Sequence, residues 1–186
     1  LVSCAEDDFV PSEQEYHDAV LIKCAVADYI VESSDMTRGV TRGMAYDDDM
    51  ITKLDLLVFE AEGSNENTLL KHLSTTINAS DSYTWDITGQ MPKDFLRNKN
   101  LILYLIANYY PSDHNDTEIT TFNPTNADTF FIVLSTDPFP PGDMLNHGIV
   151  MSQVMDGTKN YTTDVNNNLI MNFNNLERVM AKAEFF

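Results

Sequence analysis

The stretch ITKLDLLVFEAE, residues 51–62, decides the fold that this sequence predicts. Successive side chains of an extended strand point to opposite faces of the sheet. Apolar side chains occupy both faces here: Leu54, Leu56 and Val58 on one, Leu57 and Phe59 on the other. A strand that is apolar on both faces is covered on both faces, so this stretch predicts a central strand of a sheet. The turn-forming sequence GSN, residues 63–65, ends the strand.

Shorter apolar segments surround this stretch and are expected to pack on it as strands. They are residues 19–31, 69–77, 82–87, 100–108, 169–173 and 176–186. The composition of residues 19–31 also allows a helix, but alternation and β-branched content favour a strand. Short helical segments are expected at residues 91–98 and at 125–134, the latter with Phe130, Phe131 and Leu134 facing inward. The pattern predicts an all-β protein with one or two short helices in its loops.

Charge excludes two classes of partner. The chain of 186 residues has 11 Lys and Arg against 29 Asp and Glu, a net charge of −18. Nucleic acids and anionic membrane surfaces are bound through basic patches, so neither is expected as an electrostatic partner. The acidity is typical of a well-solvated, self-repelling surface, as on exported proteins.

The start of the chain resembles an export signal. Residues 1–4, LVSC, resemble a bacterial lipobox, in which the signal peptide is cut just before a cysteine whose sulfur then carries the lipid. Cys4 is therefore the candidate lipidation site, with palmitate as the expected acyl chain. The acidic run AEDD, residues 5–8, resembles the surface-export signal of Bacteroidales lipoproteins. The alternatives are a chance tetrapeptide and a solvated tether. Residues 1–18 are interpreted as a lipoprotein tether.

A small tandem repeat follows the first strand candidate. Residues 36–43 read MTRG then VTRG, so that Arg38 and Arg42 are each followed by glycine. This segment is either a loop between two strands or an exposed site for an arginine-specific protease. Residues 19–45 are interpreted as an N-terminal strand with its processing loop, and residues 46–186 as the body of the domain.

No pattern of catalytic or metal-binding residues occurs. The nucleophile elbow, the phosphate-binding loops and the zinc-protease motif are absent from the sequence. The acidic run at residues 47–49 and the Asp-Asn segment at residues 164–175 lack the pattern of a calcium loop. Cys4 and Cys24 allow one disulfide but no disulfide framework, and a Cys24–His17 nucleophilic pair lacks an orienting group. We therefore expect no enzyme activity, no metal and no cofactor.

Taken in order, these features resemble the N-terminal domain of a Bacteroidales-type fimbrillin, the subunit family of type V pili. The matching pieces extend over most of the chain: the lipobox-like start, the Thr-Arg pairs at 37–38 and 41–42, KLDLLVFEAEG at 53–63, LYLIAN at 103–108, IVMS at 149–152 and LERVMAKAEFF at 176–186. No single piece is diagnostic, and the resemblance is carried by their order.

The resemblance implies a transthyretin-like β-sandwich of about seven antiparallel strands with Greek-key-like connections. It implies export as a lipoprotein and anchoring at the outer membrane through the lipid on Cys4. It also implies proteolysis after Arg38 or Arg42, which removes the first strand and opens a groove. An extended strand from the next subunit then fills this groove, so that the pilus grows by donor-strand exchange.

The sequence suits such an exchange. The first strand candidate carries an apolar row that fits a groove between strands: Val20, Ile22, Cys24 and Val26. Removing it would leave unpaired backbone that an incoming strand can pair with. Family members have a second, C-terminal sandwich after the LERVMAKAEFF-type strand. This domain is absent from the present sequence, which we interpret as a fragment or as a single-domain relative.

We therefore expect a structural subunit or accessory protein of a bacterial surface fimbria that serves cell adhesion. Its expected partners are other fimbrial subunits, an arginine-specific protease, outer-membrane lipid through Cys4, and host proteins or glycans. The alternatives are a fimbrial anchor subunit and a surface lipoprotein that binds glycans or host proteins without polymerising. An exposed aromatic platform near Trp85, Tyr109 and Tyr110 would favour the binding module.

Overall fold

The computed structural model describes residues 18–27, 50–79, 82–97, 99–114, 116–130, 147–156 and 161–179. These residues form eight strands: β1 (Val20–Val26), β2 (Ile51–Glu60), β3 (Leu69–Ala79), β4 (Ser82–Asp86), β5 (Leu101–Ala107), β6 (Met151–Asp156), β7 (Tyr161–Thr163) and β8 (Leu169–Arg178). The helices are short: α1 (Lys93–Arg97), α2 (Ala127–Phe130) and the 3-10 helices η1 (Pro111–His114), η2 (Ile119–Thr121) and η3 (Pro124–Asn126). The prediction of an all-β protein with short helices is confirmed. No helix in the described ranges has the length and apolar content to cross a membrane.

Strand β2 has the central position that its sequence predicts. It lies between β3 and β5 and is antiparallel to both. Leu54, Leu56 and Val58 are fully buried in a first hydrophobic core. Leu57 and Phe59 are fully buried in a second core on the opposite face. The pairing with β5 also confirms residues 100–108 as the neighbour of this stretch.

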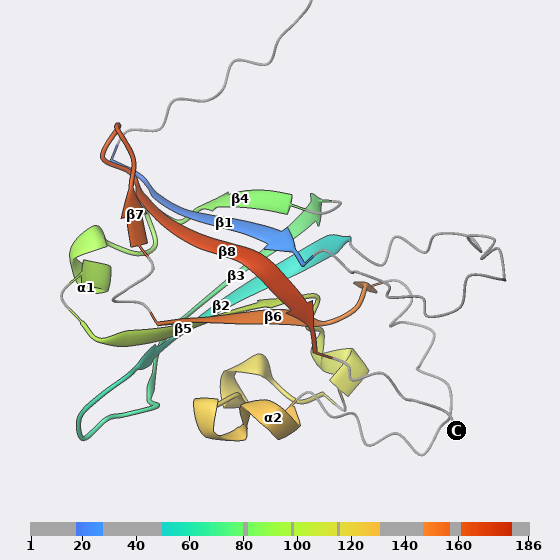
Figure 1. Ribbon diagram of the computed structural model, residues 1–186. Helices are drawn as coiled ribbons and strands as arrows, with labels where there is room; N and C mark the ends of the chain where they lie inside the picture. Colours follow the sequence, from blue (N-terminus) through green and yellow to red (C-terminus); the bar gives the residue numbers. More distant parts are fainter. Residues whose placement is uncertain are drawn as a thin grey trace, which may run out of the picture.

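The strands form one curled sheet. Their order is β3-β2-β5-β6-β8-β1-β4, and β7 pairs with β8. Strands β3 and β4 stand at the two ends of this order, yet only residues 80–81 separate them in the sequence. This short connection holds the two ends close together, so the sheet curls around the first core (Figure 1). One half of the sheet, β3-β2-β5-β6, therefore faces the other half, β8-β1-β4.

The second core lies on the outer face of β2 and β5. Ile119 and Phe122, from the segment after β5, pack there against Leu57 and Phe59. The rings of Phe59 and Phe122 lie 6.0 Å apart, and α2 closes this side of the molecule (Figure 1). Because this segment covers the outer face, β2 is buried on both sides. Phe130 packs against this core as expected; the other inward-facing residues of the expected helix, Phe131 and Leu134, lie outside the described residues.

The expectation of a purely antiparallel arrangement is wrong for one pair. Strand β1 is parallel to β8, with Val20 opposite Leu169 and Cys24 opposite Phe173. Antiparallel neighbours joined by a tight turn have a signature in the sequence, whereas a parallel pair formed by strands far apart in the chain has none. The sequence could therefore not indicate this pairing.

The expected strands at residues 169–173 and 176–186 are one strand as far as Arg178. The step of two residues from Cys24 to Val26 in β1 lies opposite a step of three residues from Phe173 to Leu176 in β8. Strand β8 therefore contains a β-bulge with one extra residue. The bulge returns Leu176 to the same core as Phe173, although their separation of three residues breaks the alternation. This break in the alternation of apolar side chains is why the sequence predicts two strands, at residues 169–173 and 176–186. Residues 180–186 lie outside the described part.

Burial of both faces of β2 can be tested with one substitution on each face. We expect Leu56→Ala and Leu57→Ala each to lower the free energy of unfolding by about 2–5 kcal/mol, because each opens a cavity in a packed core. Denaturant unfolding followed by circular dichroism measures both. Val165→Ala is the matched control because Val165 is 100% exposed, and we expect a change within about 0.5 kcal/mol. A negligible effect of Leu57→Ala would contradict the second core.

Candidate functional site

Strand β1 is enclosed on both edges. It pairs with β8 in parallel from Val20 to Val26, and with β4 in antiparallel fashion from Leu21 to Ala25. In Figure 1 it lies between these two strands, in the half of the sheet that faces β2 and β5. We call the position between β8 and β4 that β1 fills the β1 slot. Strand β2 does not border this slot.

The apolar row of β1 faces the first core. Val20, Ile22 and Cys24 are between 0% and 2% exposed, and Val26 packs against the same core while partly buried. The structure therefore brings the four residues of the predicted row together on one face. Full burial of such a side chain contributes about 1.5–3 kcal/mol. The row accordingly supplies much of the attachment of β1 to the rest of the sheet.

Cys24 is a free, buried thiol, so the Cys4–Cys24 disulfide that the sequence allowed is not formed. Its Sγ lies 3.6 Å from the carbonyl oxygen of Tyr83 on β4. Burial raises the pKa of Cys24 to about 11, and the contact with Tyr83 opposes this rise only partly. The thiol behaves as a small core residue rather than as a nucleophile.

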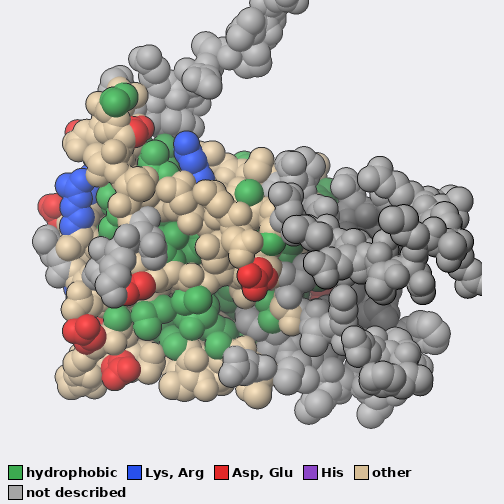
Figure 2. All heavy atoms as spheres, viewed as in Figure 1, with side chains coloured by type: hydrophobic (Ala, Val, Ile, Leu, Met, Phe, Trp, Pro, Cys, Tyr) green, Lys and Arg blue, Asp and Glu red, His purple; other side chains and the backbone are tan. Residues whose placement is uncertain are grey.

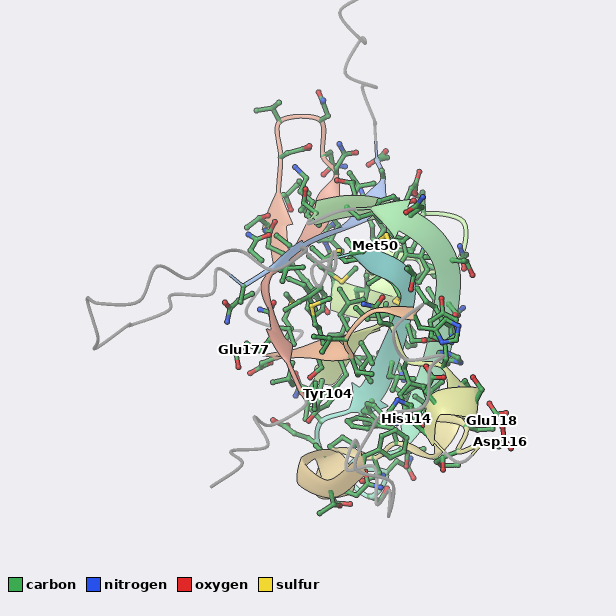
Figure 3. The ribbon with its side chains drawn as sticks, turned by 90° about the vertical axis from the view of Figure 1, so that its right-hand side faces the viewer. Met50, Tyr104, His114, Asp116, Glu118 and Glu177 are labelled. Atoms are coloured by element: carbon green, nitrogen blue, oxygen red, sulfur yellow. The ribbon has the colours of Figure 1, made fainter. Side chains whose placement is uncertain are left out.

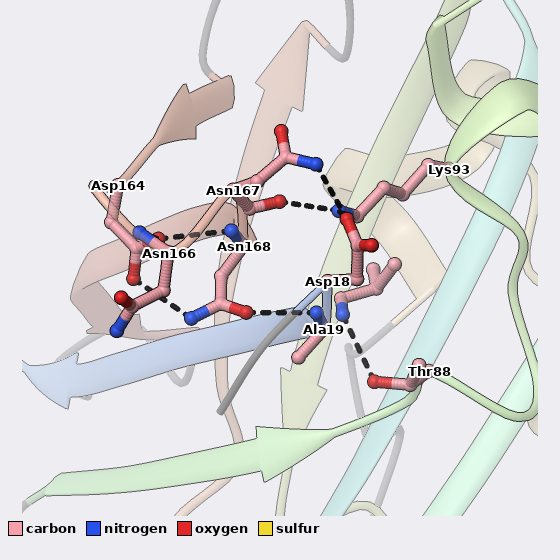
Figure 4. Close-up of polar contacts among 9 residues, drawn as sticks. Asp18, Ala19, Thr88, Lys93, Asp164, Asn166, Asn167 and Asn168 are labelled. Atoms are coloured by element: carbon pink, nitrogen blue, oxygen red, sulfur yellow. Dashed lines mark hydrogen bonds and ion pairs between the residues drawn. The ribbon is translucent and has the colours of Figure 1, made fainter. Parts of the chain in front are cut away.

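Polar contacts hold the N-terminal end of β1 (Figure 4). The Asp18 carboxylate lies 2.8 Å from Nζ of Lys93, and it accepts a hydrogen bond from the side-chain amide of Asn167. The backbone N–H of Ala19 donates to Oδ1 of Asn168 at 2.8 Å, and this bond is buried. The N–H of the next residue, Val20, donates to Oγ1 of Thr88 at 3.0 Å. We call the set Thr88, Lys93, Asp164, Asn167 and Asn168 the β1 clamp.

Asp164 organises the turn that carries three residues of the clamp. Its Oδ1 accepts hydrogen bonds from the backbone N–H groups of Asn166 and Asn168, each at 2.9 Å. Its Oδ2 accepts a third from the side-chain amide of Asn168, also at 2.9 Å. Partial burial raises the pKa of Asp164, but these hydrogen bonds outweigh that effect and leave the pKa below its ordinary value. The carboxylate therefore stays charged and keeps the turn closed at neutral pH.

The clamp was missed from the sequence. Its DVNNN segment, residues 164–168, reads as turn material, which the structure bears out. The contact between Ala19 and Asn168 spans 149 positions of the chain, and no local pattern signals it. The residue types at two positions were a local signal. Asp18 and Asn167 adopt positive φ angles, 58° and 62°, and Asp and Asn tolerate this conformation better than most residues.

The remaining predicted site residues lie outside the described ranges. These are the lipidation candidate Cys4 and the processing candidates Arg38 and Arg42. Both arginines belong to residues 28–49, which connect β1 to β2. In the sequence, this connection follows directly after Ala27, the residue next to the end of β1.

The aromatic residues considered for a binding platform are mostly internal. Trp85 is 5% exposed and faces the first core, and Tyr109 is fully buried in the second. Tyr110 is partly buried, and its ring stacks on that of His147 with centroids 3.9 Å apart. Trp85 and Tyr109 thus cannot form an exposed surface for a glycan, and the binding-module alternative gains no support from them.

A second polar cluster, also missed from the sequence, lies on the outer face of β2. The buried carboxylate of Asp55 is 3.0 Å from Nζ of Lys53 and 2.8 Å from Nε2 of His72. Oδ2 of Asp55 makes an ion pair with Lys53 rather than an aligned hydrogen bond. Lys53 also donates to the carbonyl oxygen of Tyr109 at 3.1 Å. Lys53 and Asp55 are two residues apart in β2, a spacing that places both on one face.

The loop after β5 places His114 near Asp116 and Glu118 (Figure 3). The His114 ring stacks on Tyr109 at 4.4 Å. Burial lowers the pKa of His114, and the negative charge of Asp113 opposes this. Where the structure describes the chain, no group of three or more His, Cys, Asp or Glu side chains is placed to hold a metal ion. The stacking of His114 on Tyr109, which is part of the second core, packs the loop against the outer face of the sheet.

Comparison with known proteins gives a weak structural similarity. No family model matches the chain, and no curated protein matches its sequence. Among solved structures, the chain is similar to the tip fimbrial protein Mfa3 from Porphyromonas gingivalis with C-terminal truncation, at a TM-score of 0.44 and 15% sequence identity. The match covers 86% of this chain and 48% of that structure, so the chain spans about half of its length.

Burial of Cys24 predicts slow reaction with thiol reagents. In a Cys4→Ser variant Cys24 is the only thiol, since the chain has two cysteines. With a pKa of about 11, about one thiol in a thousand is ionised at pH 8. We expect labelling of the native protein to be at least a hundredfold slower than in denaturant, and to accelerate as the pH rises towards 11. Mass spectrometry follows the reaction. Equal rates in the native and denatured protein would contradict a buried Cys24.

Proposed function

We propose that this chain is a structural subunit or accessory protein of a bacterial surface fimbria, with β1 as the strand that is exchanged during assembly. The observation that carries the proposal is the position of β1, which is hydrogen-bonded on both edges and buries its apolar row in the first core. Loss of β1 would expose the edges of β8 and β4 together with an apolar surface. An extended strand of a second subunit can satisfy both requirements.

Proteolysis in residues 28–49 would release β1 without breaking the rest of the sheet. Cleavage after Arg38 or Arg42 by an arginine-specific protease cuts the connection between β1 and β2. The order of the sheet supports this step, because β2 pairs with β3 and β5 and none of these strands pairs with β1. The cut leaves β1 held only by noncovalent contacts, so a competing strand can displace it.

The remainder of the proposal follows the sequence resemblance. In this proposal the two facing halves of the curled sheet would be the two layers of a transthyretin-like sandwich. The chain would be exported with a signal peptide, anchored at the outer membrane through lipid on Cys4, and located at the cell surface in the fimbrium. Its role would be structural and adhesive, towards host proteins or glycans, rather than enzymatic.

Exchange can be tested with the strand itself. A fluorescent peptide of residues 18–27, DAVLIKCAVA, is added to the full chain before and after treatment with an arginine-specific protease. We expect binding only after the cut, because β1 fills its slot in the intact chain. A peptide with Val20→Ser and Ile22→Ser loses two buried side chains, and we expect it to bind at least about a hundredfold more weakly. Fluorescence anisotropy measures both peptides.

The controls separate cleavage from binding. An Arg38→Lys/Arg42→Lys variant resists the protease at these positions and should not bind the peptide. Mass spectrometry of the cut chain should show cleavage at Arg38 or Arg42 and not at Arg97 or Arg178, which lie within α1 and β8. Gel ladders or filaments of the cut chain in electron microscopy would support polymerisation. A cut chain that stays monomeric and binds no peptide would contradict the proposal and favour the anchor or binding-module alternatives.

A further inference from the structure

The apolar row of a strand in the β1 slot does not define its position along the slot. Side chains alternate with a period of two residues, so a shift by one residue turns the row away from the core. A shift by two residues, however, returns apolar side chains to the same face. Val20, Ile22, Cys24 and Val26 would then still provide three buried positions. Some other contact must distinguish the observed register from the register shifted by two.

The β1 clamp is a contact of this kind. It engages Asp18 and Ala19, which precede the buried row, and the backbone N–H of Val20 at its start. A shift by two residues would move the Asp18 carboxylate by about 6.6 Å. The ion pair with Lys93, now 2.8 Å long, would then approach the distance over which solvent and salt screen exposed charges. The clamp therefore loses its ion pair in a register that the apolar row tolerates.

The clamp also distinguishes one end of a strand from the other. Asn168 accepts from the backbone N–H of Ala19, while the carbonyl oxygen of Ala19 accepts from the N–H of Leu169 at 2.8 Å. The opposite end of β1 pairs across the bulge of β8, and Val26 is only partly buried there. A strand inserted in the reverse direction would not bring its acidic N-terminal residue to Lys93.

Charge strengthens this selection. The chain has a net charge of −18, so a carboxylate on an incoming strand meets repulsion from much of the protein. On the face shown in Figure 2, the Lys and Arg side chains lie, among Asp and Glu side chains, at the end of the molecule that carries β7 and α1. Lys93 opens α1, and only 15% of its side chain is exposed. A carboxylate is therefore favoured at this end of the slot.

Resting on the proposed function, we infer that the β1 clamp sets the register and direction of any strand that enters the slot. The partner that it fits is an extended segment with an Asp immediately before a small residue and an alternating apolar row. Asn can adopt the positive φ of Asp18 but lacks the charge, so Asp is preferred over Asn. Lys93, Asn167 and Asn168 are the residues that recognise this segment.

A double-mutant cycle tests the charge contact. The full chain is cut by the protease, and the peptide of residues 18–27 is compared with its Asp18→Asn form. We expect Asp18→Asn to weaken binding about threefold to fivefold. In a Lys93→Met chain we expect the two peptides to bind equally. Lys71→Met is the matched control, because it removes the same charge from β3, at the other end of the sheet order. Equal effects of Asp18→Asn in the Lys93→Met and Lys71→Met chains would overturn the inference.

A cross-linking experiment reads the register directly. Residue 24 of a correctly placed strand lies opposite Tyr83. In a chain with Cys4→Ser, Cys24→Ser and Tyr83→Cys, we expect the bound peptide to form a disulfide through its own Cys24 in high yield. The Asp18→Asn peptide, at a concentration giving equal occupancy, should form about half as much or less, because part of it binds in the shifted register. Equal yields from both peptides would exclude a role in register.

Amide hydrogen exchange in the uncut chain, compared with peptide binding to the cut chain, distinguishes failure of this inference from failure of the proposed function. If no peptide binds the cut chain, strand exchange is contradicted, and the clamp is judged by its effect on β1 itself. Amide hydrogen exchange of Ala19 should then be about threefold to fivefold faster in Lys93→Met than in Lys71→Met. If the peptides bind but Asp18→Asn has no effect, the proposed function stands and the clamp is not selective. Unchanged amide exchange in the first case would overturn the clamp as well.

Discussion

The fold depends on the pairing of one strand, β8, with partners in both halves of the sheet. Residues before the bulge pair with β1, and Glu177 and Arg178 at its end pair with β6. A β-bulge bends the strand that contains it, and here Leu176 after the bulge faces the same core as Phe173 before it. The bulge supplies one extra residue, and the exposed N–H of Asn175 donates to the side chain of Gln153 on β6 at 2.9 Å. The bulged strand thus joins the two halves of the curled sheet and forms one edge of the β1 slot.

The two cores separate the parts of the molecule that exchange would change from those that it would preserve. The second core is built by β2, β5 and the segment that follows β5, and no residue of β1 contributes to it. In the first core, β1 supplies one row opposite residues of β2 such as Leu54 and Leu56. A molecule without β1 would therefore retain one complete core and most of the residues of the other. This division gives a physical reason why a subunit could wait for a new strand without unfolding.

Sequence reasoning succeeded where the signal was local. The two-faced apolar pattern of residues 51–62 identified the central strand, and alternation identified the face of β1 that is buried. It failed where the decisive contact is distant in the chain. The parallel pairing of β1 with β8 has no turn to announce it, and Asn168 meets Ala19 across 149 positions. The bulge at residues 173–176 was visible as a break in alternation, but a break is equally consistent with the end of one strand and the start of another. The roles of Cys4 in lipidation and of Arg38 and Arg42 in proteolytic processing stay predictions from the sequence, because these residues lie outside the described ranges.

Affinity and selectivity in the β1 slot have different physical sources. The buried row and the backbone hydrogen bonds to β8 and β4 stabilise any extended strand with alternating apolar side chains. The row requires apolar side chains but no particular one, and the backbone bonds are independent of side chains. An assembly built on these contacts alone would accept many strands in several registers, including segments of unrelated proteins. Charged and polar contacts contribute less free energy but distinguish partners, because a misplaced strand leaves them unpaired. The clamp residues lie where such contacts are most effective, at the end of the slot where the strand begins and where Lys93 is a favourable partner within an acidic molecule. A weak ion pair at that position can therefore decide which strand fits, while the apolar row decides how tightly it is held.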